Sequence, residues 1–437
     1  MKRVILILIF LVSWIWPGFA QNSSHFVTVK GTSFQLDGHR YCFLGTNFWY
    51  GVNLGALAEG GNRARLIREL DALQKSGISN LRIMGASEGL ARQFRVWPTI
   101  QPEAAQYDER LLKGMDFLLA EMAKRNLKAV IYLNNFWEWS GGMAQYVSWA
   151  TKEPYPDAHL PQFTWTQFMN FSAKLYTNAQ AEKWFENYVQ TIIERKNTIN
   201  GVEYKNDPTI MAWELANEPR AGTGEFGKNN VKNFLKWIHH ASEFIRSLDG
   251  NHLITTGSEG TIGCLGDADL FEKVHSDPNI DYATFHLWAF NWGWFKPQKA
   301  AVMFDSTLKK AHHYIRQHIR LAKQINKPIV LEEFGLPRDG HSFSPKATTF
   351  YRDRYYQKLY EWVFQNVQND GPLAGSNFWG WAGEGRARDP RHPQWKRGDD
   401  FTADPPQEPQ GLNSVFDSDS STIKILKLFA KKMNAIK

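Results

Sequence analysis

Residues 108–133 read DERLLKGMDFLLAEMAKRNLKAVIYL, and this stretch gives the clearest indication of the fold. Asp108 is a typical N-cap, and apolar residues follow it at helical spacing: Leu111, Leu112, Met115, Leu119 and Met122. Residues 127–133 are then a short, almost continuously apolar run, which is typical of a strand buried on both faces. A helix that leads into such a strand predicts one unit of an α/β protein with a parallel sheet.

The same alternation continues on both sides of this unit. We predict strands at residues 41–47, 80–84, 127–133, 210–215, 253–256, 282–286, 329–332 and 373–378. Helical patterns lie between them, near residues 63–75, 179–197, 229–248, 306–325, 347–366 and 421–434. Eight such units predict a (β/α)8 barrel. Residues 21–437 contain no linker or internal repeat, so we expect them to form this single domain.

Two connections are too long for ordinary turns of such a barrel. Residues 135–176 follow the third strand and are rich in tryptophan, and residues 380–411 follow the eighth and are rich in Gly, Pro, Arg and Asp. Both come after a strand, so we expect both loops on the same face. In barrels of this kind that face carries the active site.

The beginning of the chain resembles an export signal. Lys2 and Arg3 precede an apolar run, and Ala20 offers a small residue before Gln21, so residues 1–20 are predicted to be a cleavable signal peptide. The protein is therefore expected to be secreted, either to the extracellular space or to a periplasm. No later run has the roughly 20 apolar residues that a membrane span requires, so no membrane span is expected.

Charge and cysteine content narrow the possible partners. The formal net charge is +7 without a basic run, which does not indicate a nucleic-acid partner. Cys42 and Cys264 are the only two cysteines, and they fall on distant parts of the expected barrel, so we predict that they are not bonded to each other. A monomer is the expected state.

The chain has 18 tryptophans, and flat rings of this kind can stack on sugar faces, although packing accounts for most of them.

Two glutamates stand where strands end. Residues 213–220 read WELANEPR and place Glu218 after the fourth strand, and residues 330–335 read VLEEFG and place Glu333 at the end of the seventh. A single Glu in such a place is as often a structural ion-pair partner. Two together match the needs of a retaining glycosidase, in which one carboxyl protonates the leaving oxygen and the other attacks the anomeric carbon.

Other polar and aromatic residues end neighbouring strands. Arg82 can hold a carboxylate ionised, His286 can orient a carboxylate or a hydroxyl, and Trp379 can stack against a sugar ring. Each alone is a weak signal, since a single His or Trp at a strand end is more often a core residue.

Through these motifs the chain resembles glycoside hydrolase family 5, and within it the endo-β-1,4-mannanases. The likeness runs from about Phe26 to the last helix and includes residues 213–220 and 331–335. Further matching segments are LRIM at 81–84, NNFWEWSGG at 134–142, HLW at 286–288, NWGW at 291–294, NFWGWAG at 377–383 and QEPQG at 407–411.

The resemblance implies a role for each matching residue. Glu218 becomes the acid/base and Glu333 the nucleophile. The implied substrate-binding residues are Arg82, Asn217 at the sugar 2-hydroxyl, Arg220 on the leaving-group side, and His286, Trp288, Trp379 and Trp137. Trp288 stands where many relatives have Tyr, and an indole N–H can donate a hydrogen bond but cannot accept one. The implied activity is hydrolysis of internal β-1,4 bonds in mannan, glucomannan or galactomannan, without a cofactor, in a cleft lined by Trp137, Trp139, Trp292 and Trp294.

Several alternatives remain open at this point. An exo-acting mannosidase, a cellulase of the same family and a carbohydrate-binding barrel without turnover would share most of these residues. Residues 85–89, GASEG, match the G-x-S-x-G pattern of an esterase, but no helix is expected to begin there. Residues 222–227, GTGEFG, match G-x-G-x-x-G after the wrong strand and are predicted to be a flexible loop. No metal-binding motif is present in the sequence.

Overall fold

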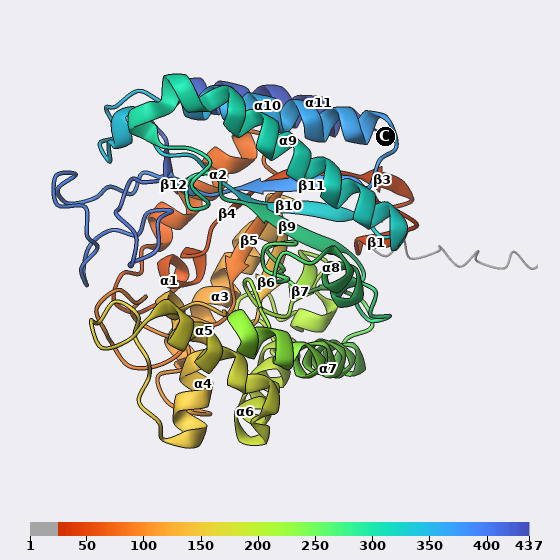
Figure 1. Ribbon diagram of the computed structural model, residues 1–437, viewed down its shortest axis with the longest axis vertical. Helices are drawn as coiled ribbons and strands as arrows, with labels where there is room; N and C mark the ends of the chain where they lie inside the picture. Colours follow the sequence, from red (N-terminus) through yellow and green to blue (C-terminus); the bar gives the residue numbers. More distant parts are fainter. Residues whose placement is uncertain (1–24, 437) are drawn as a thin grey trace, which may run out of the picture.

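A computed structural model describes residues 25–436 and contains the predicted barrel (Figure 1). The predicted signal peptide lies outside the described residues. Eight parallel strands form one sheet in the order β8-β7-β6-β5-β4-β11-β10-β9. Their bounds are β4(Phe43–Asn47), β5(Asn80–Met84), β6(Lys128–Tyr132), β7(Ile210–Glu214), β8(Leu253–Thr255), β9(Ala283–Leu287), β10(Ile329–Phe334) and β11(Leu373–Phe378). A parallel bridge between Thr255 and Tyr282 joins β8 to the start of β9, so the sheet curves into a nearly closed ring.

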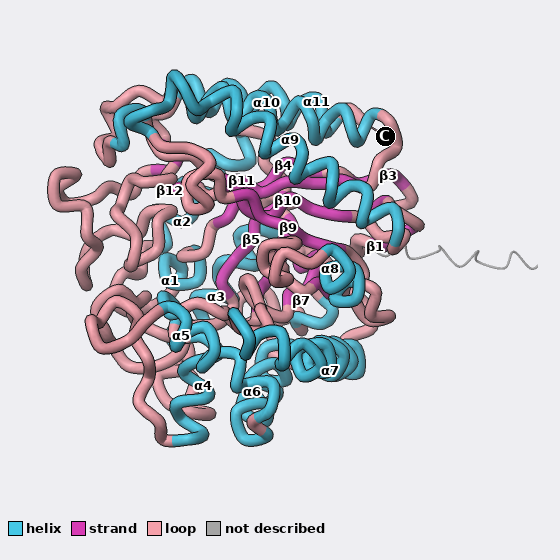
Figure 2. Tube along the Cα trace, viewed as in Figure 1, coloured by secondary structure: helices cyan, strands magenta, loops and turns pink. Residues whose placement is uncertain are grey.

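Helices surround the sheet and bury one apolar stripe each against it (Figure 2). Their bounds are α1(Gly51–Gly55), α2(Arg63–Lys75), α3(Glu109–Ala123), α6(Ala179–Ile193), α7(Gly224–Leu248), α8(Ala268–His275), α9(Ala300–Gln324), α10(Phe350–Gln368) and α11(Ser420–Asn434). The predicted cap is confirmed, because the Asp108 side chain accepts a hydrogen bond from the backbone N–H of Arg110. Short 3₁₀ turns lie between the larger elements at η3(Tyr204–Asn206), η4(Pro297–Lys299) and η5(Asp339–His341).

The predicted helices 229–248 and 306–325 began too late, since α7 begins at Gly224 and α9 at Ala300. Helix α8 was not predicted. The prediction of a flexible loop at residues 222–227 was wrong from Gly224 onward, because α7 begins there. Close packing explains the glycine at 227: a Cβ there would lie 2.8 Å from the carbonyl carbon of Gly222. The glycines therefore serve the entry into a helix and do not form a flexible phosphate-type loop.

A three-stranded hairpin sheet precedes the barrel and was not predicted. It consists of β1(Thr28–Lys30), β2(Ser33–Leu36) and β3(His39–Tyr41), paired antiparallel. Val27 and Phe34 pack against residues at the amino ends of the barrel strands, among them Tyr282 and Val330. The hairpin therefore closes the end of the barrel opposite the long loops. The predicted first strand, 41–47, merged the end of β3 with β4.

Both long loops lie at the carboxyl ends of the strands, as predicted, and loops dominate the left side of the view in Figure 2. The loop after β6 is partly helical, which corrects the expectation of a plain loop at 135–176. It contains η1(Glu138–Ser140), α4(Gly142–Thr151), α5(Trp165–Ser172) and η2(Ala173–Thr177). The loop after β11 begins with β12(Trp381–Gly383), which pairs in parallel with β13(Val415–Phe416).

The cysteine prediction is confirmed. Cys42 and Cys264 are both buried and free. Cys42 lies just before β4, whereas the Cys264 Sγ approaches the Ser258 hydroxyl at 3.9 Å on the far side of the ring. Among residues 25–436, no helix is both long and apolar enough to cross a membrane.

Candidate active site

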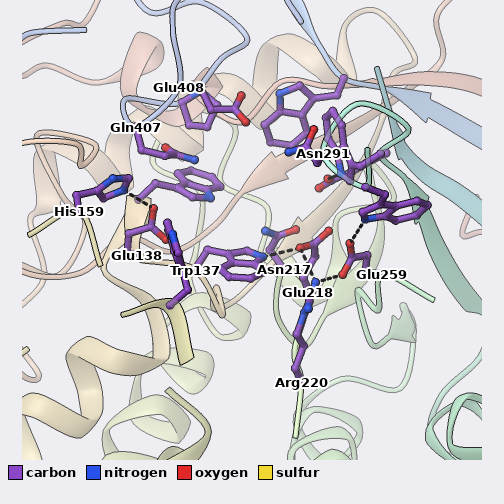
Figure 3. Close-up of a pocket in the computed structure, with 17 residues that line it drawn as sticks. Trp137, Glu138, His159, Asn217, Glu218, Arg220, Glu259, Asn291, Gln407 and Glu408 are labelled. Carbon is purple, nitrogen blue, oxygen red and sulfur yellow. Dashed lines mark hydrogen bonds and ion pairs between the residues drawn. The ribbon is translucent and has the colours of Figure 1, made fainter. Parts of the chain in front are cut away.

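A pocket of about 520 Å³ opens at the carboxyl ends of the strands (Figure 3). Its walls come from the loops after β6, β7, β8, β9 and β11, which supply residues far apart in the sequence. Both predicted carboxylates line it. So do five of the seven predicted binding residues: Trp137, Asn217, Arg220, Trp288 and Trp379. The other two, Arg82 and His286, are fully buried directly beneath the carboxylates.

Glu218 reaches the pocket from the turn after β7. Its backbone has a φ of +51°, in the left-handed region that costs a residue with a side chain free energy of order 1 kcal/mol or more. Its Oε1 lies 2.6 Å from His286 Nδ1, and the indole N–H of Trp137 donates to its Oε2. The strained turn thus holds the carboxyl in a fixed position inside the pocket.

Arg82 is the centre of a buried charge cluster. Its guanidinium donates to both oxygens of Glu214, at 2.9 and 2.6 Å, and also pairs with Glu333 Oε1. A further donation of 2.8 Å reaches Asn217 Oδ1. Burial raises the pKa of Glu214 to about 8, although the charge of Arg82 acts in the opposite direction. A single guanidinium therefore fixes the positions of two strand ends and of Asn217.

His286 lies between the two pocket carboxylates. Its Nδ1 is 2.6 Å from Glu218 Oε1 and 3.2 Å from Glu333 Oε2. Burial lowers the pKa of His286, but the surrounding carboxylates, Glu333 first, outweigh burial and raise it well above its usual value. Burial likewise raises the pKa of Glu218, yet the hydrogen bond and charge of His286 bring it below its usual value. The proton in the hydrogen bond between Glu218 and His286 therefore resides on His286.

The same three side chains, Glu218, His286 and Glu333, place one possible metal-ligand atom each within 4.8 Å of one another. Hydrogen bonding accounts for the close approach of these atoms.

A β-bulge decides how Glu332 and Glu333 point. In the pairing of β10 with β9, Leu331 lies opposite Phe285 and Glu333 lies opposite His286, so Glu332 is the extra residue. Glu333 lines the pocket, whereas Glu332 is buried beneath it with its Oε2 3.8 Å from Arg82 Nε. The bulge thus interrupts the strict alternation of side chains along β10 and places Glu332 beside Arg82.

Trp288 contacts the same carboxylate from the other side. Its indole Nε1 donates to Glu333 Oε2 at 3.0 Å, while Arg82 holds Oε1. Trp288 therefore supplies a hydrogen-bond donor to this carboxylate. Both oxygens of Glu333 are held by donors, which fixes the orientation of the carboxylate.

Aromatic rings form most of the remaining wall. Trp379 lies edge-on to Trp288, with ring centroids 5.8 Å apart, and Trp139 and Trp292 line the pocket as predicted. Trp294 does not line it, which corrects the sequence-based expectation. It packs against Trp292 at a centroid distance of 4.9 Å and supports that ring from behind.

An ion pair that the sequence did not reveal lies beside Glu218. Arg220 pairs with Glu259, and its guanidinium lies 4.9 Å from the centre of the Trp137 ring (Figure 3). Trp292 Nε1 donates to the other oxygen of Glu259 at 3.2 Å. Glu259 closely follows β8 and lines the pocket, so the signal that identified Glu218 was present here too.

A second group of missed residues stands at the opposite end of the pocket. Glu138 pairs with His159 at 3.0 Å, and Gln407 and Glu408 approach from the loop after β11 (Figure 3). Burial raises the pKa of Glu408 well above its usual value, and the nearby acids, Asp404 first, act in the same direction. The protonated form of Glu408 is therefore favoured, and in that form its carboxyl can donate a hydrogen bond to a ligand.

The serine of the G-x-S-x-G match is not an exposed nucleophile. Ser87 is buried, and its Oγ accepts a hydrogen bond of 2.9 Å from the backbone N–H of Ile100. No helix follows Gly89 directly in the described chain. The hydroxyl is a structural contact within the loop after β5.

Comparison with known proteins agrees with this site. The family described as GH family 5 beta-mannosidase-like matches residues 24–437. The chain belongs to glycoside hydrolase family 5. This confirms the resemblance inferred from the motifs, and the solved members of the family share the barrel.

Three relatives illustrate the range within the family 5 proteins. A mannan endo-1,4-beta-mannosidase of Solanum lycopersicum is 28% identical over 391 residues, covering 87% of this chain and 90% of the relative. The structure of a family 5 mannosidase from Rhizomucor miehei, a point mutant in complex with mannosyl-fructose, has a TM-score of 0.87 and 34% identity, covering 95% of this chain and 98% of that one. An endo-1,4-beta-D-mannanase of Thermotoga petrophila has a TM-score of 0.62 and 26% identity, covering 90% and 99%.

A buried acid, Glu88, holds the start of the tryptophan-rich loop at residues 135–176 in this family 5 chain. The Glu88 Oε2 accepts a hydrogen bond of 2.8 Å from Gly142 N, and its own N–H donates to Ser140 O at 2.6 Å. Burial raises the pKa of Glu88 to about 8. The protonated form is therefore the one that the folded protein prefers.

We expect Glu88→Gln to remove part of the pH dependence of stability. Because the folded-state pKa is raised, the contribution of Glu88 is complete below about pH 4.5 and is lost as pH rises toward 8, at about 1.4 kcal/mol per pH unit. The variant should match the wild type near pH 4.5 and be more stable at pH 8, as measured by urea unfolding at several pH values. Glu243→Gln, on the exposed face of α7, serves as the control and should follow the wild type. Parallel curves for Glu88→Gln and the wild type would contradict the assignment.

Proposed function

We propose that this protein hydrolyses β-1,4-mannosidic bonds by a retaining double displacement, with Glu333 as nucleophile and Glu218 as acid/base. One observation carries the proposal: oxygens of Glu218 and Glu333 lie within 4.8 Å of one another in a sugar-sized pocket. Retaining glycosidases hold their two carboxyls about 5 to 5.5 Å apart, whereas inverting enzymes leave room for water at about 6.5 to 9.5 Å.

The contacts of Glu333 suit a nucleophile. Donors from Arg82 and Trp288 stabilise its charge and fix both oxygens, so a lone pair is presented to the anomeric carbon without reorganisation. When the covalent bond forms, the same donors stabilise the carboxylate as the departing group of the second step.

The contacts of Glu218 suit an acid that receives its proton on substrate binding. His286 carries the proton at a distance of 2.6 Å before a substrate binds. A sugar in the pocket displaces water and disfavours separated charges, so the proton moves to Glu218 and from there to the leaving oxygen. In the second step Glu218 takes a proton from water.

The substrate class rests on relatives and on the walls of the pocket. The relatives named above carry mannan or mannoside names, and Trp379 offers a flat face to a pyranose ring. We further propose that Asn217, held by Arg82, contacts the 2-hydroxyl and that Arg220 lies on the leaving-group side. We propose β-mannan, glucomannan or galactomannan as the polymer, acted on by an exported monomer.

The relatives named mannan endo-1,4-beta-mannosidase support cleavage inside the chain. A second candidate is removal of single mannose units from the chain end. It is favoured by Gln407 and Glu408, which occupy one end of the pocket and leave less room for further sugars there. The family description, beta-mannosidase-like, and the similarity to the Rhizomucor miehei mannosidase also support this second candidate.

The products formed early from linear mannan distinguish these two modes of action. Internal cleavage is expected to lower viscosity while few bonds have been broken and to release a mixture of oligosaccharides. Removal from chain ends should instead release mannose while viscosity stays constant. Chromatography and viscometry on the same samples give both readouts. Faster turnover of carboxymethyl cellulose than of mannan would contradict the proposed substrate.

A further inference from the structure

A second pocket of about 450 Å³ lies on the same face of the barrel, outside the catalytic pocket. Two loops build it: the one after β5, with Phe94 and Trp97, and the one after β11, with Trp395 and Arg397. We propose that this second pocket binds a stretch of neutral β-mannan while another stretch occupies the catalytic pocket. The proposal rests on the function proposed above.

The rings of the second pocket are held in place by defined contacts. Trp395 stacks on Phe401 with centroids 5.8 Å apart and planes at 15°, and it is only 8% exposed. Trp97 is half-buried, and its Nε1 donates to Glu59 Oε2 at 3.3 Å. Rings that are already fixed lose little conformational entropy when a ligand stacks on them. The second pocket is thus a preformed aromatic surface.

Phe94 connects the second pocket to the catalytic one. Its ring lies 4.7 Å from that of His159, and His159 lies 5.4 Å from Trp165. Trp165 in turn lies 6.1 Å from Trp137, whose indole donates to Glu218. His159, Trp165 and Trp137 all line the catalytic pocket. An unbroken series of ring contacts therefore runs from the acid/base to the second pocket.

The second pocket has a polar rim, which includes the cations Arg92, Lys396 and Arg397 as well as two amide side chains. Arg397 is paired with Glu59 at 2.5 Å, and its guanidinium lies over the Trp97 ring at 5.1 Å from the centre. Its charge is therefore already balanced, while the amide side chains of Gln93 and Gln394 offer hydrogen bonds at the rim. Flat rings with a polar rim match a pyranose, which has apolar faces and a hydroxylated edge.

The test uses binding without turnover. In a Glu333→Gln background, affinity electrophoresis in gels containing linear glucomannan should show strong retardation. Adding Trp97→Ala should weaken the apparent affinity by about tenfold, which is what one lost stacking ring contributes. Trp97→Phe keeps a flat ring and should restore most of the retardation. Phe350→Ala removes an exposed ring from α10 and serves as the matched control, with no expected change.

Activity on a short substrate separates this proposal from the proposed function. In the wild-type background, Trp97→Ala should hydrolyse mannotriose within about twofold of the wild type, since the trimer fills only the catalytic pocket. Failure of the wild type itself to cleave mannotriose or mannan would refute the proposed function alone. Unchanged retardation of Trp97→Ala would refute the second pocket alone.

Two further outcomes would also overturn the proposal. Equal losses on mannotriose and on glucomannan would mean that Trp97 acts through the catalytic pocket. Stronger Trp97-dependent retardation in polygalacturonate than in glucomannan would assign the pocket to acidic glycans. If Trp97→Ala unfolds, Phe94→Asn gives the same test, because the backbone φ of +65° at Phe94 suits asparagine.

Discussion

Glu333→Gln is expected to lower the rate of mannan hydrolysis by about ten-thousandfold or more, because the amide cannot form the covalent glycosyl-enzyme. The fold should survive, since glutamine keeps an oxygen for the Trp288 N–H and differs little in volume. Steady-state kinetics on mannotetraose, with thermal unfolding alongside, measures both. Activity within about a hundredfold of the wild type would contradict the assignment.

Glu332→Gln is the matched control for this prediction. Glu332 is buried next to Arg82 but does not line the pocket, so its loss should be far smaller. A 2-deoxy-2-fluoro-mannosyl donor slows breakdown of the intermediate and should leave its sugar on Glu333, where peptide mass mapping can find it. A sugar on Glu332 would show that the bulge in β10 lies one residue away from its described place.

Glu218→Ala is expected to lower mannan hydrolysis by about a thousandfold, because the leaving sugar then departs without a proton. Formation of the glycosyl-enzyme from a dinitrophenyl β-mannoside should be affected much less, since that leaving group needs no acid. Its turnover should then be limited by the second step. Azide, which attacks without a general base, should accelerate it and yield β-mannosyl azide.

Glu259→Ala is the control for azide rescue. Glu259 is a carboxylate of the same pocket, and it pairs with Arg220. It does not hold the nucleophile, because the oxygens of Glu333 are held by Arg82 and Trp288. Its loss should raise KM more than it lowers kcat, and azide should have no effect. Equal losses of Glu218→Ala on both substrates, without azide rescue, would mark Glu218 as structural.

The barrel was predictable because each strand is a short apolar run between helical patterns. At Asn80–Met84 and Leu373–Phe378 the predicted and observed strands coincide. The hairpin β1–β3 escaped prediction because its strands are three or four residues long and only half-buried. Runs so short carry too few side chains to show an alternation.

The catalytic pair and the cluster beneath it were also predictable, since Glu218, Glu333, Arg82 and His286 all lie in predicted strands or shortly after them. Glu259 stands as far beyond β8 as Glu218 stands beyond β7, and it was missed because no recognised motif surrounds it. Glu138, His159 and Glu408 come from long loops, where no periodic pattern fixes which side chains face inward. The bulge at Glu332 depends on pairing with β9, a contact between distant segments.

The hairpin that closes the amino end of the barrel has a consequence for the order in which the chain folds. Phe34 packs edge-on against Tyr282, with centroids 5.2 Å apart, and shares a core with Val330 and Ala374. During synthesis the hairpin leaves the ribosome first, yet the cover of its apolar face is complete only when the last strands have been made. Contacts of such high sequence separation form late and slow folding. We therefore expect the hairpin to be fully packed only when the ring of strands is complete.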